Sequence, residues 1–412
     1  MDDLLFLCHR IPYPPNKGDK LRSFNLLKQL GRRHRVHLGT FIDDEDDWRH
    51  TDAVRAMTGD CHFARLFPRR AKLRALPALI GGQPLSVPYY RDDGLKRWVD
   101  GLLERRAVRQ AVVFSGAMAQ YVTGGRYAAL RRIVDFVDVD SDKWRQFALA
   151  QTWPMSWIYR REARTLLAFE RRVAVEMDAS VFVSAREAAL FRQLAPEAAA
   201  RVWDVHNGVD TDYFDPAREY PSPYNAAERA VVFTGAMDYR ANVDAVEWFV
   251  RDVFPLLRQR HPAVRFYIVG ARPTEAVRRL ARSSGVIVTG GVYDIRPYLA
   301  HAVAAVAPLR IARGVQNKVL EAMAMGRPVA ATPQAVEGIS CRAGEEVMVG
   351  ESAAALAEWL GTVVSGGAAA MGAAARRRVM KDYSWKDNLR RFESLLERTD
   401  SARPAALDIG VK

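Results

Sequence analysis

Short apolar runs alternate with helix-length amphipathic stretches along the chain, and this alternation occurs in both halves. In the first half, the strand-like residues 4–7 are followed by the helix-like residues 20–30. In the second half, the strand-like residues 231–235 and 265–270 flank a helix-like segment over 242–260. Such alternation is typical of βαβ units, in which crossover helices join parallel strands. It predicts an α/β fold of two doubly wound, parallel-sheet, Rossmann-like domains that face a cleft, with ligands outside the carboxyl ends of the strands.

A cluster of turn-forming residues marks the boundary between the two halves. Asn207-Gly208, Asp215-Pro216 and Pro221-Ser222-Pro223 all fall between residues 204 and 224, and such combinations favour turns and loops. We therefore expect Rossmann-like domains over 1–204 and 205–380, a C-terminal amphipathic helix within 381–400 and a tail over 401–412. The Gly/Ala-rich residues 365–375 carry no helix prediction. Two domains also suit the length, because 412 residues exceed what one hydrophobic core usually serves.

Composition narrows the class of protein. With 49% apolar residues the chain does not read as intrinsically disordered. Its most apolar stretches, such as residues 303–309, fall short of the ~20 residues that span a bilayer. Cys8, Cys61 and Cys341 form no CxxC pair, which predicts a reduced compartment and neither a disulfide framework nor a cysteine zinc site. The acidic start does not resemble a secretory signal, so we expect a cytoplasmic protein.

The net charge of +13 is distributed unevenly. Residues 1–200 hold 33 Lys and Arg against 24 Asp and Glu, whereas residues 201–412 hold 28 against 24. Residues 60–132 alone hold 14 basic against 5 acidic side chains. Such an excess indicates an anionic partner, which could be nucleic acid, anionic lipid head groups or a phosphorylated substrate.

The densest group of candidate ligand-binding residues lies between residues 308 and 338. A strand ends near Pro308, a loop carries Gly314, and a helix begins near Gln316. Gly314 would let backbone approach a ligand, and the helix N-terminus would offer N–H groups to a phosphate. Lys318 and Glu321 lie three residues apart, hence on one helical face. The cation suits a diphosphate and the carboxylate suits a ribose diol; a surface Lys–Glu helix pair is an equally weighted alternative.

Two further loops follow predicted strands of the second half. In the first, Gly235 precedes Arg240, which could face a phosphate, and Asn242, a plausible N-cap of the next helix. In the second, Gly290-Gly291 precedes Tyr293, and this loop could contact a flat base. Each signal is weak alone, because a single Arg in a loop is usually solvated.

The first half contains two candidate segments. Residues 10–22 join the first strand to the first helix, and the absence of GK[ST] excludes a P-loop. This proline-stiffened loop with Gly18 predicts a wall of the cleft. Residues 135–142 place four acids at the end of a buried strand, with Asp138 and Asp140 on one side of the chain. A Mg²⁺ site and helix capping are open alternatives there, and a catalytic carboxylate is favoured.

These motifs together resemble those of family 4 of the retaining, nucleotide-sugar-dependent glycosyltransferases, which have the two-domain GT-B fold. The resemblance is carried by SARE at 184–187, HNGVD with FDP at 206–216, FTGAMDYRANVDAVEWF at 233–249, FYIVG at 266–270, VTGGVYD at 288–294 and GVQNKVLEAMAMGRPVAAT at 314–332. RIPYPPNKGDKLRS at 10–23 and DFVDVDSDKW at 135–144 resemble a narrower group, the sugar transferases associated with bacterial exopolysaccharide and exosortase (PEP-CTERM) loci.

The resemblance implies a set of site residues. The second glutamate of an E-x7-E motif binds the donor ribose and matches Glu321, whereas the first glutamate is replaced here by Arg313. No histidine stands near residues 135–140, where relatives carry one. We expect three groups: catalytic Asp138, Asp140 and Arg313; donor-binding Gly235, Arg240, Tyr293, Gly314, Asn317, Lys318 and Glu321; and Lys17, Gly18, Asp19 and Arg22 on the acceptor side.

The resemblance also implies an activity. We expect a glycosyltransferase of the hexosyltransferase type that moves a sugar from a nucleotide-sugar donor to a polyprenyl-diphosphate-linked or other glycan acceptor in exopolysaccharide biosynthesis. Transfer should retain stereochemistry and need no metal or other cofactor, and the C-terminal helix should pack on the N-terminal domain. Residues 65–74 and 153–161 interleave basic and apolar side chains, which favours a peripheral position on the anionic inner face of the cytoplasmic membrane. A sugar-nucleotide 2-epimerase and a non-enzymatic anion binder are the alternatives; no nucleic-acid-binding motif is present.

Overall fold

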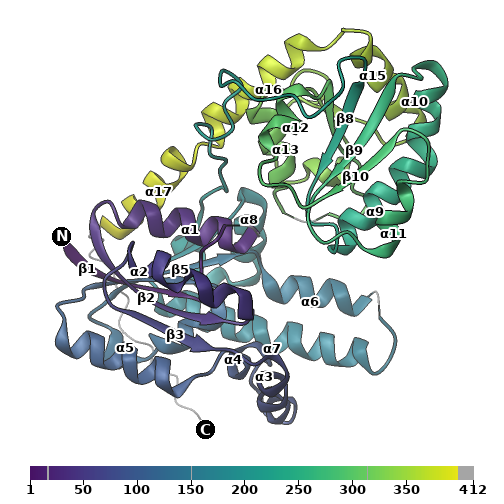
Figure 1. The fold of residues 1–412 in the computed structure, drawn as a ribbon. Coiled ribbons are helices and arrows are strands. Elements are labelled where there is room, and N and C mark those ends of the chain that lie inside the picture. Colours follow the sequence, from purple (N-terminus) through teal and green to yellow (C-terminus); the bar gives the residue numbers. More distant parts are fainter. Residues whose placement is uncertain (16–17, 150, 313, 398–412) are drawn as a thin grey trace. The chain divides into compact units, whose positions relative to one another are not determined.

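The protein is described by a computed structural model over residues 1–15, 18–149, 151–312 and 314–397 (Figure 1). The chain divides into two compact units, each with its own sheet. The first unit contains Met1–Val205 and the chain from Leu389 onward, and the second contains His206–Asn388. All strand pairs within the two sheets are parallel. The predicted pair of doubly wound parallel-sheet domains is therefore confirmed.

The sheet of the first unit has seven strands in the order β3-β2-β1-β4-β5-β6-β7. These are β1 (Asp2–Cys8), β2 (His34–Ile42), β3 (Cys61–Arg65), β4 (Gln110–Phe114), β5 (Arg131–Val137), β6 (Ala179–Phe182) and β7 (Val202–Asp204). Strand β1 is central and its residues from Leu4 to Cys8 are fully buried, because helices cover both faces of the sheet. The order reverses between β1 and β4, which is where a doubly wound sheet binds ligands.

The helices of the first unit follow the predicted alternation, with additional short elements. They are α1 (Gly18–Leu30), η1 (Glu45–His50), α2 (Thr51–Arg55), α3 (Pro68–Ala75), η2 (Leu76–Leu79), α4 (Ser86–Tyr89), α5 (Asp93–Arg105), η3 (Gly116–Tyr121), η4 (Gly125–Tyr127), α6 (Asp140–Leu149), α7 (Met155–Glu176), α8 (Ala185–Leu194) and η5 (Pro196–Arg201). Residues 45–55 form the 3₁₀ turn η1 followed by the short helix α2, and Asp44 caps that turn by accepting the N–H of Asp46. The sequence did not predict β7, α3 or α6.

The second unit has a six-stranded sheet in the order β10-β9-β8-β11-β12-β13, with its reversal between β8 and β11. Its strands are β8 (Arg229–Thr234), β9 (Val264–Val269), β10 (Val286–Gly290), β11 (Ala304–Ala307), β12 (Val329–Ala331) and β13 (Met348–Val349). Its helices are α9 (Arg240–Trp248), the π-helical turn η6 (Phe249–Val253), α10 (Phe254–Arg260), α11 (Glu275–Leu280), α12 (Arg296–His301), α13 (Asn317–Ala324), α14 (Pro333–Val336), α15 (Ala353–Val364), α16 (Ala369–Asp382) and the start of α17 (Trp385–Glu397).

The Gly/Ala-rich segment without a helix prediction forms part of α16. A Cβ on Gly372 would overlap the carbonyl oxygen of Gly326, just beyond α13. The small residues therefore let α16 approach the end of α13 at backbone distance. The small side chains that gave no helix prediction therefore serve a close contact between helices in the structure.

The last helix, α17, ends in the first unit. Leu389, Phe392, Leu395 and Leu396 are buried. The guanidinium of Arg131 donates to the Leu395 carbonyl through Nε (3.0 Å) and Nη2 (2.6 Å). Within the described ranges no single helix is long and apolar enough to cross a membrane, and only α15 and α16, bent by 104°, meet that test as a pair.

The approach of α16 to α13 gives a prediction about stability. Gly372→Ala should destabilise the second unit by about 1–3 kcal/mol, because the added methyl group must displace the Gly326 backbone. Thermal unfolding of purified protein measures this. Gly125→Ala is the control, since nothing lies within 4 Å of its added Cβ. An equal effect of the two substitutions would contradict the close contact.

Candidate functional site

Two glycines bring the ends of β8 and β9 together in the second unit. Gly235 follows β8, and a Cβ there would lie 2.7 Å from Asn242 Nδ2. Gly270 follows β9, and a Cβ there would overlap the Gly235 carbonyl oxygen. Neither position has room for a side chain. Glycine is therefore required at both positions for the two loops to pack closely at the reversal of the sheet, which is where such sheets bind ligands.

Asn242 ties this loop to helix α13. It is 5% exposed, its Nδ2 donates to the Ala236 carbonyl (2.9 Å), and its Oδ1 accepts from Lys318 Nζ (2.5 Å). The expectation that Asn242 caps the helix is wrong: Tyr239 occupies the cap position and α9 begins at Arg240. Because the Asn242 amide is committed to the loop and to Lys318, it fixes the position of the lysine instead.

Lys318 and Glu321 lie in the first turns of α13. The Lys318 ammonium lies 4.7 Å from the centroid of the Phe233 ring, at the end of β8. Burial lowers the pKa of Lys318 to about 8, opposed by the charge of Glu321. Burial raises the pKa of Glu321 to about 7, opposed by Lys318. Among the described residues none donates a hydrogen bond to the Glu321 carboxylate, so its oxygens are available as acceptors.

The loop before α13 provides further polar groups. Gly314 has φ of +64°, and its carbonyl accepts from Gln316 Nε2 (3.2 Å). Asn317 is the first residue of α13, and its buried Oδ1 has no hydrogen-bond partner within the described part of the chain. A buried oxygen without a donor is costly, so this atom suits a hydroxyl or N–H supplied by a ligand. Arg313 lies outside the described residues.

The remaining donor-side candidates are exposed. Arg240 is at the start of α9, and no described carboxylate pairs with it. Tyr293 is fully exposed beyond β10. The structure thus gathers Gly235, Lys318 and Glu321 near the sheet reversal, whereas the side chains of Arg240 and Tyr293 contact none of them.

Sequence reasoning missed an aromatic group beside this site. The guanidinium of Arg296 lies 3.8 Å from the centroid of the Tyr213 ring and pairs with Asp294 (2.7 Å). Burial and the charge of Asp294 raise the pKa of Tyr213, and Glu321 adds to this shift, so Tyr213 lies near the Glu321 carboxylate. Tyr213 and Arg296 are far apart in sequence, and no local pattern joins them.

In the first unit, Arg22 occupies a buried ion pair. Its Nε donates to Asp135 Oδ2 at 2.7 Å and its Nη1 to the Val205 carbonyl at 2.9 Å. The two side chains are 1% and 0% exposed. Arg22 was expected on the acceptor side, but its guanidinium is enclosed and committed to Asp135. The structure corrects this placement: Arg22 anchors the end of β5 and is not a surface cation.

The loop after β5 has a strained backbone. Val137 has φ of +72°, a conformation that β-branched residues rarely adopt. Its N–H donates to Asp135 Oδ1 (3.1 Å), and its carbonyl accepts from Val183 N (2.8 Å). Such strain persists only where surrounding contacts enforce it, and it concentrates at functional sites. Here the buried Asp135 supplies one of those contacts directly ahead of Asp138.

Two more carboxylates, of the partly buried Glu187 and the buried Glu170, fix the same loop. Glu187 accepts the N–H of Val139 (2.8 Å). Glu170 accepts the N–H (3.2 Å) and the hydroxyl (2.5 Å) of Ser141. Burial, together with the charge of Asp140, raises the pKa of Glu170 to about 8. The loop that carries Asp138 is therefore preorganised by side chains from α7 and α8.

Lys143 neutralises the two predicted catalytic acids. Its Nζ lies 2.8 Å from Asp138 Oδ2 and 2.9 Å from Asp140 Oδ1. Burial would lower the pKa of Lys143, but the charges of Asp140 and Asp138 raise it above its usual value. In the described parts of the chain no group of three or more His, Cys, Asp or Glu is arranged to hold a metal ion.

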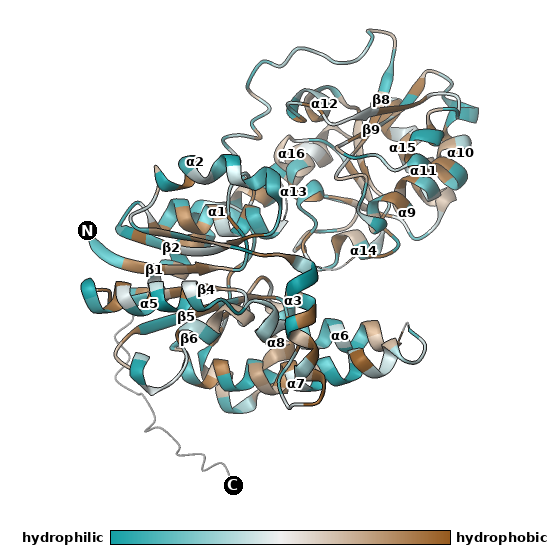
Figure 2. Ribbon diagram, turned by 60° about the horizontal axis from the view of Figure 1, so that its bottom comes forward, coloured by the Kyte–Doolittle hydropathy of each residue, from teal (hydrophilic) through white to brown (hydrophobic). Residues whose placement is uncertain are grey.

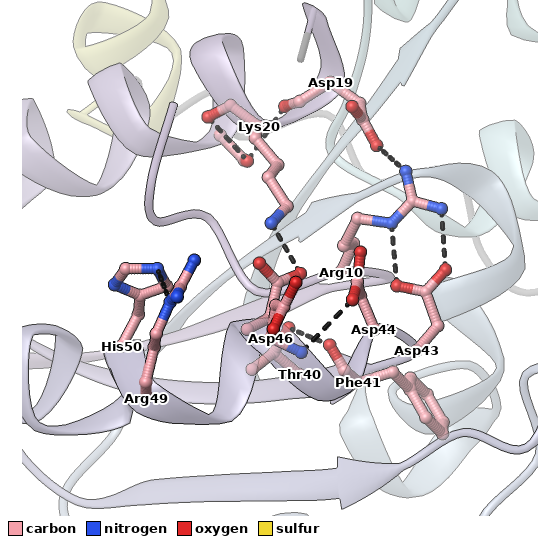
Figure 3. Close-up of polar contacts among 12 residues, drawn as sticks. Arg10, Asp19, Lys20, Thr40, Phe41, Asp43, Asp44, Asp46, Arg49 and His50 are labelled. Atoms are coloured by element: carbon pink, nitrogen blue, oxygen red, sulfur yellow. Dashed lines mark hydrogen bonds and ion pairs between the residues drawn. The ribbon is translucent and has the colours of Figure 1, made fainter. Parts of the chain in front are cut away.

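The loop between β1 and α1 carries a second charged cluster (Figure 3). Asp19 accepts Arg10 Nη1 (2.6 Å), and Arg10 binds Asp43 through Nε (3.0 Å) and Nη2 (2.8 Å). His9 Nε2 lies 3.4 Å from Asp19. Burial would raise the pKa of Asp19, but the His9 hydrogen bond and the Arg10 charge hold it well below its usual range. Gly18 begins α1, and Lys17 lies outside the described residues.

Arg10 and Asp43 were not among the predicted site residues, although a signal existed. They follow the neighbouring parallel strands β1 and β2, and the carboxyl ends of parallel strands share one edge of a sheet. His9 also follows β1 and stacks on Phe114 at the end of β4, with ring centroids 5.7 Å apart. The cluster therefore lies at the sheet reversal of the first unit.

Comparisons with known proteins agree with this architecture. Residues 228–365 match the family model described as "Glycosyl transferases group 1". No curated protein sequence matches the chain. The structure is similar to sucrose-phosphate synthase from Thermosynechococcus elongatus, at 16% identity and a TM-score of 0.67 over 96% of this chain and 98% of that one.

Two further solved structures extend the likeness. HepE of Anabaena, in complex with UDP, has 14% identity and a TM-score of 0.67 over 96% of this chain and 100% of that one. WaaG, a glycosyltransferase involved in lipopolysaccharide biosynthesis, has 16% identity and a TM-score of 0.61 over 95% and 99%. The structural neighbours confirm the predicted GT-B fold, and the family match confirms the predicted enzyme class, a glycosyltransferase.

The buried ion pair of the first unit gives a second prediction. Arg22→Met should cost about 3–5 kcal/mol of unfolding free energy, because Asp135 is left buried without its partner. The double substitution Arg22→Met/Asp135→Asn should recover part of this loss. Urea denaturation measures both. Arg33→Ala breaks the exposed pair with Glu397 and should cost under about 1 kcal/mol; similar costs for Arg22→Met and Arg33→Ala would refute the anchoring role.

Proposed function

We propose that this glycosyltransferase transfers a sugar from a nucleotide-sugar donor to a glycan acceptor with retention of stereochemistry. The observation that carries the proposal is the Lys318–Asn242 hydrogen bond beside the Glu321 carboxylate, which no described residue pairs with, at the β8/β11 reversal. This site lies inside the segment that matches the group 1 model. Support for the donor class comes from HepE, whose solved structures include complexes with UDP and with UDP-glucose.

Each part of a nucleotide-sugar has a matching group in the second unit. The Lys318 ammonium would bind the diphosphate, with Asn242 holding it in place, and the exposed Arg240 would add a second cation. The backbone of the loops at Gly235 and Gly314 would contact phosphate oxygens. Glu321 would accept two hydrogen bonds from the ribose diol and the Asn317 oxygen a further one. Backbone near Tyr293 would contact the base.

The departing diphosphate would be stabilised without a metal ion. Charge develops on it as the bond to the sugar breaks, and preorganised donors lower the barrier most when they face that charge. Lys318, Arg240 and the free N–H groups at the start of α13 are donors of this kind. Arg313, which replaces the glutamate that contacts the donor sugar in relatives, is proposed as a catalytic residue. Mg²⁺ is then dispensable, and no other cofactor is required.

The first unit would supply the acceptor side and the catalytic carboxylate. Asp138 is held by Lys143 in a loop that three carboxylates fix, two of them buried. It would stabilise the positive charge that develops at the donor sugar carbon, with Asp140 supporting it through the shared lysine. Asp19 and Gly18, with Lys17 before them, would line the acceptor side.

The acceptor we propose is a polyprenyl-diphosphate-linked glycan in exopolysaccharide assembly. Support comes from the loop and strand-end motifs over 10–23 and 135–144 and from the basic excess in the first half. An acceptor carried by lipid requires an enzyme that works in the cytoplasm at the inner membrane face. Nucleic acid is not a proposed partner.

The donor site is tested by a thermal-shift screen with UDP, GDP and ADP. A nucleotide at about 100 times its Kd should stabilise the protein by ~2.7 kcal/mol. Glu321→Ala should abolish most of this shift while the unliganded melting temperature changes little, because its carboxylate serves the ligand and has no described donor. Glu358→Ala, an exposed glutamate on α15, is the control. No shift with any nucleotide in folded protein would contradict the proposed donor class.

Affinity for the diphosphate should depend on pH. Burial lowers the pKa of Lys318 to about 8, so its ammonium is lost as pH rises through that value. Calorimetric affinity for the nucleoside diphosphate should therefore fall between about pH 7 and pH 9. Lys318→Arg should keep its charge and flatten the profile, while Arg240→Gln should weaken binding without flattening it. A wild-type profile that stays flat to pH 9 would exclude Lys318 as the phosphate cation.

The catalytic carboxylate is tested in a transfer assay with the donor that the screen identifies. Asp138→Asn should lower kcat by at least about a hundredfold and leave donor affinity unchanged, because it acts on charge in the transition state. Asp142→Asn, four residues further on in α6, is the matched control. EDTA should leave the rate intact; strict dependence on Mg²⁺, or release of an epimerised sugar in place of transfer, would contradict the proposal.

A further inference from the structure

The first unit carries large apolar side chains on its surface in two segments. One comprises the end of α3 and the turn after it, where Leu73 and Leu76 are exposed and Ile80 is 97% exposed. The other comprises the connection from α6 to α7 and the first turn of α7, where Trp153 is 79% exposed and Trp157 is half-exposed. Single exposed apolar residues are ordinary, but grouped ones mark a surface that binds something.

A buried arginine joins the two segments. Arg161 is one helical turn after Trp157 on α7, and its guanidinium donates to backbone carbonyls of the turn after α3. Those acceptors are Ala78, Leu79 (3.0 Å), Gly81 and Gln83 (3.1 Å). Next to it, Glu162 accepts the N–H groups of Leu85 (2.7 Å) and Ser86 (3.2 Å). Ile80 and Trp157 are therefore held on one part of the surface.

The helical hairpin itself is rigid. Helices α6 and α7 lie side by side in both overall views, with polar and apolar residues along them (Figures 1 and 2). Trp144 on α6 packs on Tyr159 of α7, with ring centroids 5.1 Å apart. The exposed Trp153 thus lies at the end of a packed hairpin rather than in a long loop.

Cations lie along the first of these two segments. Residues 65–83 contain five Lys and Arg and no Asp or Glu, whereas in residues 143–161 Lys143 and Arg145 pair with aspartates and Arg161 is buried. Arg69, Arg70 and Lys72 on α3 are exposed, and no described carboxylate pairs with them. Unpaired cations beside exposed Trp, Ile and Leu match the head groups and the acyl boundary of an anionic bilayer.

We propose that this apolar–basic face, formed by Arg69, Arg70, Lys72, Leu73, Leu76, Ile80, Trp153 and Trp157, docks the enzyme on an anionic lipid bilayer. Its apolar side chains enter the interface and its cations lie among the head groups. At this face the enzyme would meet the proposed lipid-linked acceptor, and this part of the proposal rests on the proposed function. The docking itself requires neither donor nor acceptor.

The test is cosedimentation of the full chain with vesicles, without nucleotide. Wild-type protein should bind vesicles with about 30% phosphatidylglycerol at least tenfold more tightly than pure phosphatidylcholine vesicles. Raising salt from ~0.1 M to ~1 M should weaken this binding, because the screening length falls from about 10 Å to about 3 Å. Equal binding to both vesicle types, or none to either, would overturn the proposal.

Variants separate the face from general stickiness. Ile80→Ser/Trp153→Ser/Trp157→Ser and Arg69→Gln/Arg70→Gln/Lys72→Gln should each weaken vesicle binding by about tenfold or more. The matched controls change exposed residues of the second unit: Leu256→Ser/Met380→Ser and Arg279→Gln/Arg282→Gln should bind as wild type. Face variants that bind as tightly as wild type would refute the assignment.

Two further readouts distinguish the possible failures. Thermal unfolding and the nucleotide-induced shift should be unchanged in the face variants, because the donor site lies in the other unit. Failure of nucleotide binding with intact docking would therefore refute the proposed function alone. A wild-type dimer in light scattering that the apolar variant converts to monomer, without vesicle binding, would show that a second copy covers the face and overturn the lipid proposal.

Discussion

The hydrogen bond from the Lys318 ammonium to the Asn242 side chain connects the parts of the second unit that matter for its chemistry. It links the first turn of α13 to the first turn of α9, and through the Asn242 amide it also holds the loop that begins at Gly235. The Lys318 ammonium lies beside the Phe233 ring and is desolvated there, which costs free energy. The neighbouring described acid is Glu321, whose own pKa burial raises to about 7. A ligand with two negative charges would lower this cost, because it would supply the negative charge that the protein does not place beside the ammonium.

In the first unit the signs are reversed, because acidic side chains rather than a lysine hold the backbone of the candidate loop. Its candidate catalytic loop is rich in acids, and the buried carboxylates of Asp135 and Glu170, with the partly buried Glu187, accept its N–H groups. The strained Val137 is stable only because these acceptors exist. One of them, Asp135, can stay buried only because Arg22 pairs with it. Both candidate sites therefore lie beside the reversal of a parallel sheet, and each is set by buried charge rather than by loop sequence alone.

Local patterns in the sequence predicted the parts of this structure that local patterns determine. The alternation of apolar runs predicted most strands of both sheets, and a spacing of three residues placed Lys318 and Glu321 on one helical face. The patterns failed where distant residues decide. Arg22 and Asp135 are separated by 113 positions, so nothing near Arg22 distinguishes a buried anchor from a cation in a cleft. Likewise, the role of Asn242 depends on Lys318, 76 positions away, and a small polar residue near a helix start otherwise resembles a cap.

The positive charge of the chain illustrates the same limit. A count of Lys and Arg treats every cation as surface charge, yet Arg22, Arg132 and Arg161 are buried and serve backbone carbonyls or carboxylates. In the sequence, Arg161 is grouped with Trp157 as a surface residue. Arg161 is buried, but its burial does not remove the apolar surface; it helps to form it. Arg161 donates hydrogen bonds to four carbonyls of the turn after α3. It thereby holds Ile80 on the surface near Trp153 and Trp157. The buried Arg161 thus helps to form the exposed apolar part of the face. The exposed Arg69, Arg70 and Lys72, with which no described carboxylate pairs, can bind an external anion.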